Sequence, residues 1–420
     1  MSSFLSTISG HRALKALHYR EFRLVCGAQV FGNIGMWMDE LSRGWLIYQL
    51  TDSVVQLGLA RGIQFIPLLL ISPLAGTAAD RYSRRTLLLV SQTMQGLSFA
   101  ALTLLIVSGH VAPWHVYVIA VITGMMQTIQ QPARASIVTD TVPPELLTNA
   151  IGLTSLVFNM ARLTGPALAG AIIAFADTGG AFAVQAACLF AAVLWTVRLP
   201  ALRRSDDRAV KARRESFMHS IVEGWRFSWH HQAVRAGILC TTIVCMLMFP
   251  FTTLLPVFAR DLLQVGPQGL GLLRSAPALG ALPMAVLLSR WPPHVNPGRK
   301  LFAAVAAFGA CMVVFGLSRS FWVSAAALAL SGAADMVSVV VRQTLVQLET
   351  PPHMRGRVAA VNSLFIGASN QLGEFESGAT AALFGPVGSV VAGGVGTMLV
   401  AWTWSRSFPA LAARPRLTPR

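Results

Sequence analysis

The stretch RASIVTDTVPPELLTNAIGLTSL (134–156) returns in outline 208 residues later as RQTLVQLETPPHMRGRVAAVNSL (342–364). The first Arg, the Pro-Pro pair and the closing Ser-Leu hold the same positions in both copies. A second echo pairs LGLAR (57–61) with LGLLR (270–274). Because several anchors agree in two separate places, we interpret the chain as two related halves that arose by duplication.

The composition indicates a membrane protein. Of the 420 residues, 54% are hydrophobic and 12% are charged, whereas soluble domains carry about 25% charged residues. Mean hydropathy is +0.59. An apolar run of about 20 residues crosses the hydrocarbon core as a helix. The chain accommodates twelve such runs, at 24–48, 55–77, 86–108, 114–138, 149–175, 180–198, 236–259, 268–289, 301–318, 321–344, 358–382 and 386–405.

The net charge of +16 follows the expected topology rather than a nucleic-acid surface. With the N-terminus in the cytoplasm, 25 of the 33 Lys and Arg residues fall in cytoplasmic segments, and the outer loops hold only Arg260 and Arg319. This positive-inside bias predicts a multi-pass protein of the plasma (inner) membrane with both termini in the cytoplasm. Basic tracts with stacking aromatics are absent, so we expect no nucleic-acid partner.

The longest polar interruption, 200–235, divides the predicted spans into two groups of six. We therefore expect an all-α integral membrane fold with an N-terminal six-helix bundle (1–199), a cytoplasmic linker (200–235) and a C-terminal six-helix bundle (236–420). Because six is even, both bundles have the same orientation in the membrane. Such parallel repeats are the arrangement of one large class of secondary transporters.

The second part of the linker shows a helical pattern. Phe217, Ile221 and Trp225 recur every four residues, with basic residues on the other faces. This predicts an amphipathic helix. It lies either on the inner membrane surface or against the ends of a bundle, and the pattern alone does not choose between them.

The absence of two kinds of motif argues against an ATP-driven pump and a membrane hydrolase. The only lysines, Lys15, Lys211 and Lys300, do not follow a glycine, so there is no Gly-Lys-Ser or Gly-Lys-Thr phosphate loop and no nucleotide is expected. A membrane hydrolase would need a nucleophile beside a base or a His-Glu-x-x-His site, and neither occurs. The five cysteines lie in apolar runs without metal-ligand spacing. We expect no enzyme activity, no cofactor and no metal.

The segment GTAADRYSRR (76–85) resembles the signature of the major facilitator superfamily. That signature is a Gly, an Asp-Arg pair, a second Gly and a closing basic pair between the second and third spans, and here Ser83 replaces the second Gly. Gly165-Pro166 and Gly170 resemble a motif of the fifth span in exporters. GWLIYQLT (44–51), PAR (132–134), EGWR (223–226) and LPVFAR (255–260) resemble the branch with enterobactin exporters and macrolide efflux pumps.

The resemblance covers the whole chain and implies a major facilitator fold that works by alternating access. It implies a proton-coupled antiporter that exports a small molecule, either a siderophore or an amphipathic drug, from the cytoplasm. Its expected partners are that substrate, protons and the bilayer, and we expect a monomer. Import or uniport by the same fold stays open, as does a membrane scaffold that transports nothing, although a scaffold would not need acids inside the membrane.

The resemblance also implies a latch at the cytoplasmic ends. In the superfamily the acid of the signature faces the start of helix 11, which implies here that Asp80 faces the backbone amides after Gly356. A base of the signature reaches an acid at the end of helix 4, which implies that Arg84 pairs with Asp140. An acid at a helix N-terminus gains about 0.3–1 kcal/mol, weak enough to open in each cycle. The predicted cytoplasmic gate comprises Gly76, Asp80, Arg81, Arg84, Arg85, Arg134, Asp140 and Arg342.

Three charges, Asp39, Glu40 and Arg43, lie inside the first predicted span. Three lipid-facing charges near the bilayer centre would cost roughly 7–10 kcal/mol, so they face protein or a water-filled cavity. Either carboxylate can pair with Arg43, and Arg162 in the fifth span is a partner for the other. Burial of such an acid permits loading and release of a proton. A purely structural ion network is the alternative.

The second half carries its own acids, Asp335, Glu374 and Glu376, which have no acidic counterparts in the first half. Helices 1, 4, 7 and 10 line the cavity in the superfamily, which favours Asp335 over the other two. Asp335 and Arg342 lie seven residues apart, about 10 Å along one helix face, and Gln127 and Arg134 repeat that spacing. The predicted coupling and substrate residues are Asp39, Glu40, Arg43, Arg162, Gln127, Asp335, Glu374 and Glu376.

Overall fold

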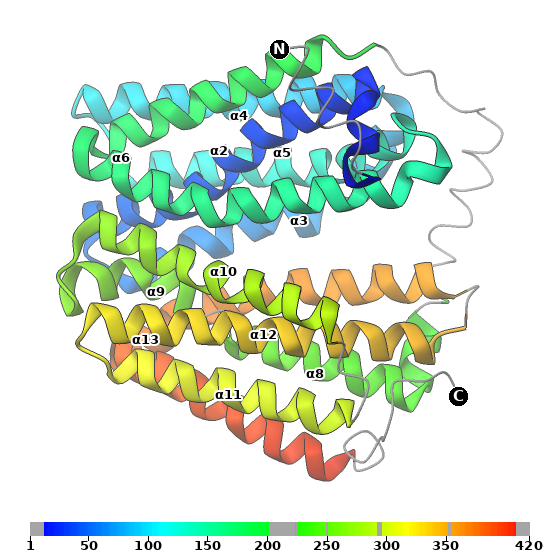
Figure 1. Cartoon of the computed structure of the whole chain (residues 1–420). Helices are drawn as coiled ribbons and strands as arrows, with labels where there is room; N and C mark the ends of the chain where they lie inside the picture. Colours follow the sequence, from blue (N-terminus) through cyan, green and yellow to red (C-terminus); the bar gives the residue numbers. More distant parts are fainter. Residues whose placement is uncertain are drawn as a thin grey trace. The chain divides into compact units, whose positions relative to one another are not determined.

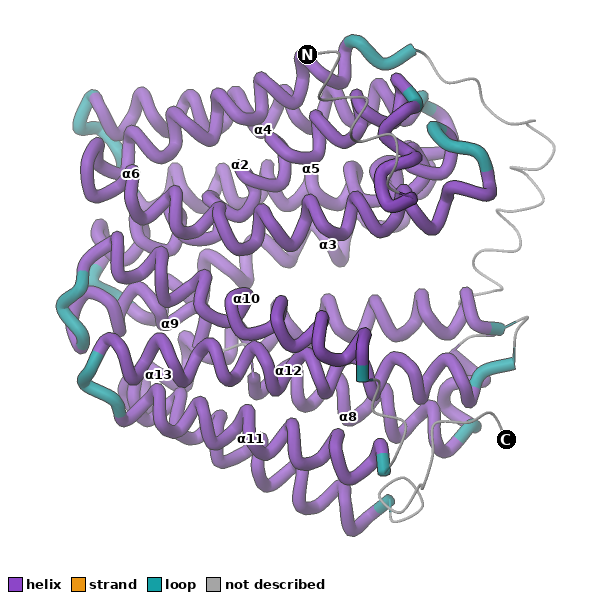
Figure 2. Tube along the Cα trace, viewed as in Figure 1, coloured by secondary structure: helices purple, strands orange, loops and turns teal. Residues whose placement is uncertain are grey.

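The structure is a computed structural model that describes residues 12–200, 223, 225–248, 251–291, 296–351 and 354–408. This part of the chain is almost entirely helical and contains no strand (Figure 2). Its elements are η1 (Arg12–His18), α2 (Arg20–Thr51), α3 (Val54–Arg81), α4 (Arg84–Val107), α5 (Pro113–Asp140), η2 (Pro144–Leu146), α6 (Leu147–Val197), α8 (Gln232–Met248), α9 (Phe251–Val257), η3 (Phe258–Leu262), α10 (Gly266–Arg290), α11 (Pro297–Leu317), α12 (Phe321–Glu349) and α13 (Arg355–Ser407). Among the described residues, 7 helical stretches are long and apolar enough to cross a membrane.

The two longest helices, α6 and α13, each consist of two helices joined at a break. The break in α6 lies at Ala176 and Asp177, and Asp177 has φ 61° and ψ 176°. The break in α13 lies at Gly385, with φ 75° and ψ 163°. These positions are 208 residues apart, the offset of the sequence repeat. The same offset relates the first residues of α5 and α12 and the first residues of α6 and α13.

The helices form two compact units, and each is described by itself. Unit 1 comprises Met1–Thr51 and Ile63–Ser205, and unit 2 comprises Asp52–Gly62 and Asp206–Arg420. Within unit 1, α6 packs against α2 and α4 (Figure 1). Within unit 2, α11 packs against α12 and α13, and α10 packs against α12 (Figure 1). Helix α3 begins in unit 2 and continues in unit 1.

A buried cluster of apolar side chains joins the helix ends at one side of unit 1. Phe22 of α2, Leu88 of α4, Ile137 of α5 and Leu199 beyond α6 belong to one buried cluster. Phe99 and Phe182 add a ring contact between α4 and α6, with centroids 5.9 Å apart. The cluster holds the ends of these four helices together, and Arg134 lies beside it in α5.

Glycines let neighbouring helices approach closely, as is common in membrane proteins. In unit 2, a Cβ atom built on Gly309 of α11 would lie 2.6 Å from the carbonyl oxygen of Gly394 in α13. In unit 1, a Cβ atom on Gly165 of α6 would lie 2.6 Å from Cβ of Trp37 in α2. The absence of a side chain at these positions therefore sets the distance between the helix axes.

The predicted amphipathic helix is described only at its end, and Phe217 and Ile221 lie outside the described residues. Trp225 stacks on Phe365 of α13 with ring centroids 5.2 Å apart, and Trp229 stacks on Trp225 at 6.2 Å. Phe227 packs on a buried cluster that joins α8, α12 and α13. The described end of this helix is therefore part of unit 2 and packs against its helix α13.

Candidate functional site

The first buried ion pair lies within α2. Arg43 Nε donates to Asp39 Oδ1 at 3.1 Å, Arg43 Nη2 pairs with Asp39 Oδ2, and Nη2 also donates to Thr123 Oγ1 of α5 at 2.9 Å. Asp39 is 4% exposed and Arg43 is 3% exposed. Nη1 of Arg43 is buried and finds no hydrogen-bond acceptor among the described residues. Of the two acids that the sequence offered, Asp39 is therefore the partner of Arg43, and Glu40 is half-buried beside it.

The predicted exporter motif lies where α6 meets α2. Gly165, Pro166 and Gly170 are buried, and Gly165 faces Trp37 across the helix contact. Arg162, one turn earlier, places its guanidinium 5.7 Å from the centroid of the Trp37 ring. Arg162 thus lies against the helix that carries Asp39 and Glu40, as expected for neighbouring first and fifth spans.

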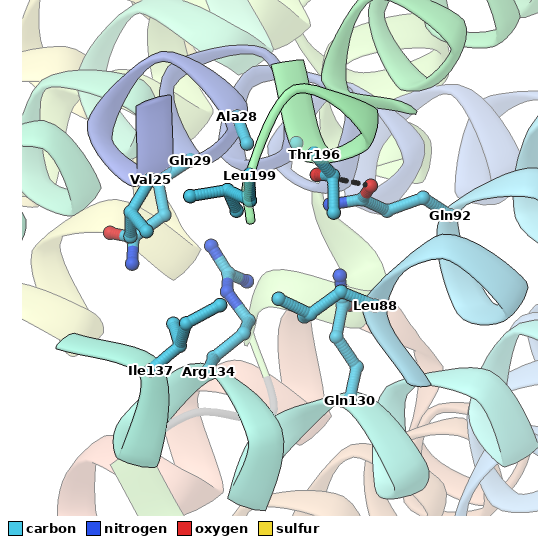
Figure 3. Close-up of a pocket in the computed structure, with 11 residues that line it drawn as sticks. Val25, Ala28, Gln29, Leu88, Gln92, Gln130, Arg134, Ile137, Thr196 and Leu199 are labelled. Atoms are coloured by element: carbon cyan, nitrogen blue, oxygen red, sulfur yellow. Dashed lines mark hydrogen bonds between the residues drawn. The ribbon is translucent and has the colours of Figure 1, made fainter. Parts of the chain in front are cut away.

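A second cation of unit 1 faces a hollow. Arg134 is half-buried, and its Nη2 donates to Oδ1 of Asn33 in α2. The hollow, here called the Arg134 hollow, is a shallow depression with an interior volume of about 20 Å³. It is lined by Val25, Ala28, Gln29, Gly32, Leu88, Gln92, Gln130, Arg134, Ile137, Thr196 and Leu199. Figure 3 shows the guanidinium of Arg134 pointing into it, and the hydroxyl of Thr196 donates to Gln92 Oε1 at 2.9 Å.

The counterpart of Arg134 in the second half has a different partner. Arg342 of α12 pairs with Asp335 in the same helix, with Nη2 and Oδ1 3.7 Å apart. Its Nε donates to the carbonyl oxygen of Ser338 at 3.4 Å. Asp335 was predicted as a cavity acid and Arg342 as a gate residue, and the structure joins the two in one ion pair.

The acids of α13 differ from each other in surroundings. Glu374 lies 3.5 Å from Nε of Arg61, with both side chains about one-tenth exposed, and accepts a hydrogen bond from Thr252 of α9 at 3.4 Å. Arg61 lies in the part of α3 that belongs to unit 2. Glu376 is half-buried. The structure therefore places Glu374 in a buried polar cluster of unit 2.

The start of α4 is organised by Ser83, the residue that departs from the superfamily signature. Its side chain accepts a hydrogen bond from the backbone N–H of Thr86 at 3.1 Å and caps the helix. Arg84 forms the ion pair with Asp140 that was expected from the sequence, and Arg85 Nη2 donates to the carbonyl oxygen of Val197 at 2.6 Å. At the remaining gate residues Gly76, Asp80 and Arg81, and at Gly356, the structure describes the helical backbone alone.

The sequence did not predict three of the residues that contact the charged side chains: Asn33, Thr123 and Arg61. Asn33 and Thr123 are uncharged residues within apolar runs, and nothing in their spacing indicates that they meet Arg134 and Arg43. Arg61 had a signal, since it closes the repeated LGLAR segment and is a charge inside a predicted span. Gln127 is half-buried, and Gln130, nearly one turn later, lines the Arg134 hollow in its place.

Solved structures with the same fold are membrane transporters. The bacterial homologue of the human lysosomal transporter Spinster, in an inward-facing unoccupied conformation, matches with a TM-score of 0.74 at 16% identity over 95% of this chain and 98% of that chain. A POT family transporter in complex with a thioalcohol-conjugated peptide matches with a TM-score of 0.71 at 12% identity over 94% of this chain and 97% of that chain. These similarities establish the major facilitator fold.

Sequence relatives narrow the family. The enterobactin exporter EntS of Escherichia coli O1:K1 is 25% identical over 94% of this chain and 92% of its own length. The staphyloferrin A transporter of Staphylococcus aureus (strain NCTC 8325) is 25% identical over 67% of this chain and 70% of its own length. The family described as transmembrane secretion effector matches residues 12–414. The chain is therefore a transporter and not an enzyme, and it belongs to the transmembrane secretion effector family of the major facilitator superfamily.

Proposed function

We propose that this protein is a proton-coupled antiporter that exports a siderophore or a similar amphipathic small molecule from the cytoplasm by alternating access. The observation that carries the proposal is the similarity to an enterobactin exporter across 94% of the chain. Buried acids paired with arginine inside apolar helices give it a chemical basis, because such groups are expensive in a membrane and mark transport or coupling sites.

We propose twelve spans in two six-helix bundles, 1–199 and 236–420, with 200–235 as the cytoplasmic linker, both termini in the cytoplasm and a monomeric working form. The breaks at Asp177 and Gly385 support this count, because each divides one long helix into two membrane-length pieces. The shared offset of 208 residues supports the two repeats. The concentration of Lys and Arg in the predicted inner segments supports the orientation.

For coupling we propose that Asp39 carries the proton. A proton on Asp39 removes its negative charge and with it the attraction that holds Arg43 Nε and Nη2. Arg43 then keeps its bond to Thr123 and is available to an anionic group. Loading of the proton and binding of substrate thus act on the same guanidinium, which links the two events. The Asp335–Arg342 pair offers the same exchange in unit 2.

The direct test is transport by the purified protein in proteoliposomes with an imposed pH gradient, with iron-free enterobactin and iron-free staphyloferrin A as alternative substrates. We expect substrate-dependent proton release, and we expect Asp39→Asn to abolish it. Glu40→Gln and Asp335→Asn are the second and third variants, and Glu145→Gln, at an exposed acid outside the predicted coupling site, is the control. Equal transport without a gradient, surviving neutralisation of all three acids, would show that the antiport proposal is wrong. Uptake from the outer face driven by the gradient would favour import.

The Arg84–Asp140 pair is predicted to affect transport more than stability. Both side chains are about one-third exposed, so the pair contributes less than about 1 kcal/mol to folding. We expect Arg84→Asp to slow transport at least fivefold while the thermal unfolding midpoint changes little. The exchanged variant, Arg84→Asp with Asp140→Arg, should regain at least half of the wild-type rate. Wild-type transport by the single variant would contradict a role in the cytoplasmic gate.

A further inference from the structure

The lining of the Arg134 hollow contains one positive charge and no negative charge. Its lining brings together one guanidinium, three glutamine side chains, one threonine and several apolar side chains, and none of the lining residues carries a carboxylate. Among the described residues, the hydrogen-bond partner of Arg134 is the neutral amide of Asn33. Glutamine and threonine can donate or accept hydrogen bonds, but they cannot balance a full positive charge.

The repeat supplies an internal comparison. Arg342 occupies the position 208 residues after Arg134, and there the fold provides Asp335 as a counter-charge at 3.7 Å. The corresponding residue of the first half is Gln127, which is neutral and does not line the hollow. One copy of the arginine is therefore balanced by the protein, and the other faces a polar hollow. A cation that is partly withdrawn from water, as the half-buried Arg134 is, is stabilised when an anion accompanies it.

We propose that the Arg134 hollow binds a carboxylate group of the transported molecule, so that the substrate supplies the missing counter-charge. This inference rests on the proposed function and adds the chemical class of the recognised group. The planar guanidinium donates two parallel hydrogen bonds to a carboxylate, a geometry that a lysine ammonium does not reproduce. Gln29 and Gln130 lie on the same lining and provide amide donors for further oxygens.

The size of the hollow limits what enters it. Its interior volume is only about 20 Å³, about the space of one water molecule. It therefore takes at most the end of one carboxylate, and the rest of the substrate lies outside it. Gly32 of α2 lines the hollow, and a Cβ atom built on it would meet nothing within 4 Å. A larger side chain at this position can fill the hollow without disturbing the helices.

The test measures binding of citrate to the full-length protein in a maltoside detergent free of phosphate, by isothermal titration calorimetry. We expect citrate to bind and its uncharged ester, triethyl citrate, not to bind. Arg134→Gln and Gly32→Val should each weaken citrate binding at least tenfold, the first by removing the charge and the second by filling the space. Arg134→Lys should keep part of the affinity. Arg299→Gln, at an exposed arginine of α11, is the matched control and should bind like the wild type.

Two results would overturn the inference. The first is citrate binding of wild-type strength in both Arg134→Gln and Gly32→Val, which would place the anion elsewhere. The second is loss of citrate binding when phosphatidylglycerol is added to the detergent, which would show that a lipid phosphate occupies the hollow. If Arg134→Gln does not fold, Gly32→Val still tests the inference, because it fills the hollow and leaves every charge in place.

Binding and transport separate this inference from the function on which it rests. If the wild type exports iron-free staphyloferrin A with the pH gradient as the driving force but the two variants bind citrate normally, the carboxylate site is wrong and the exporter stands. If citrate binding depends on Arg134 but no gradient-driven export occurs, the exporter proposal fails and the anion site stands.

Discussion

Replacement of Asp39 by Leu is expected to lower the free energy of unfolding by about 3–5 kcal/mol. Arg43 is 3% exposed and receives its charge compensation from Asp39 through two of its nitrogen atoms. Without the carboxylate, the guanidinium keeps its bond to the neutral hydroxyl of Thr123. An unbalanced buried cation accounts for the large cost. The measurement is unfolding of the purified variant by SDS titration in mixed micelles, compared with the wild type.

The double variant Asp39→Leu with Arg43→Met separates stability from coupling. Removing both charges replaces the pair with apolar groups of similar size, a change that is often neutral or stabilising. We expect most of the lost stability to return while proton-coupled transport stays absent. If the double variant transports with normal proton coupling, the pair is structural, and another acid carries the proton.

Gly394→Val is the second substitution with a large expected effect. A Cβ atom at this position would lie 2.7 Å from the carbonyl oxygen of Gly309 and 3.0 Å from Cγ2 of Val313, both in α11. Because the nearest obstacle is backbone, α11 and α13 must separate before any side chain fits. Overpacking of this kind costs about 1–3 kcal/mol or more. Thermal unfolding of the purified variant should show a clear fall in the midpoint.

Helix α13 contains its own control for this prediction. Gly367 lies in the same helix, and a Cβ atom built on it would meet nothing within 4 Å. Gly367→Val should therefore leave the midpoint nearly unchanged or raise it slightly, because valine has a higher helix propensity than glycine. Equal loss of stability in Gly394→Val and Gly367→Val would mean that α13 is sensitive to any β-branched residue and that the close approach to Gly309 is not the cause.

The fold could be predicted from the sequence because membrane helices must be apolar along their length. Runs of apolar residues, the 208-residue echo and the signature around Ser83 pointed to one family. The pairing of Arg84 with Asp140 was also predicted, since the superfamily resemblance supplied a long-range contact that composition cannot. What the signature did not supply is the role of Ser83, whose hydroxyl caps α4 in place of a glycine turn.

The candidate site was predicted less completely, for two physical reasons. Spacing along one helix left Asp39 and Glu40 equivalent, because residues three and four positions away both reach Arg43, and only packing selects one. The rise of about 10 Å between residues 335 and 342 suggested separate roles. The long arginine side chain bridges that distance and meets Asp335 at 3.7 Å. Contacts between helices, such as that of Arg134 with Asn33, leave no trace in local spacing.

The two helix breaks lie 208 residues apart and share one backbone geometry. Gly385 adopts its positive φ freely, whereas Asp177 adopts nearly the same angles with a side chain, in a backbone region that costs other residues about 1–3 kcal/mol. Its carboxylate accepts a hydrogen bond from the N–H of Thr178 at 2.5 Å and offsets part of that cost. Two different residues, an aspartate and a glycine, thus form the same backbone turn in the two halves, so the turn does not depend on glycine.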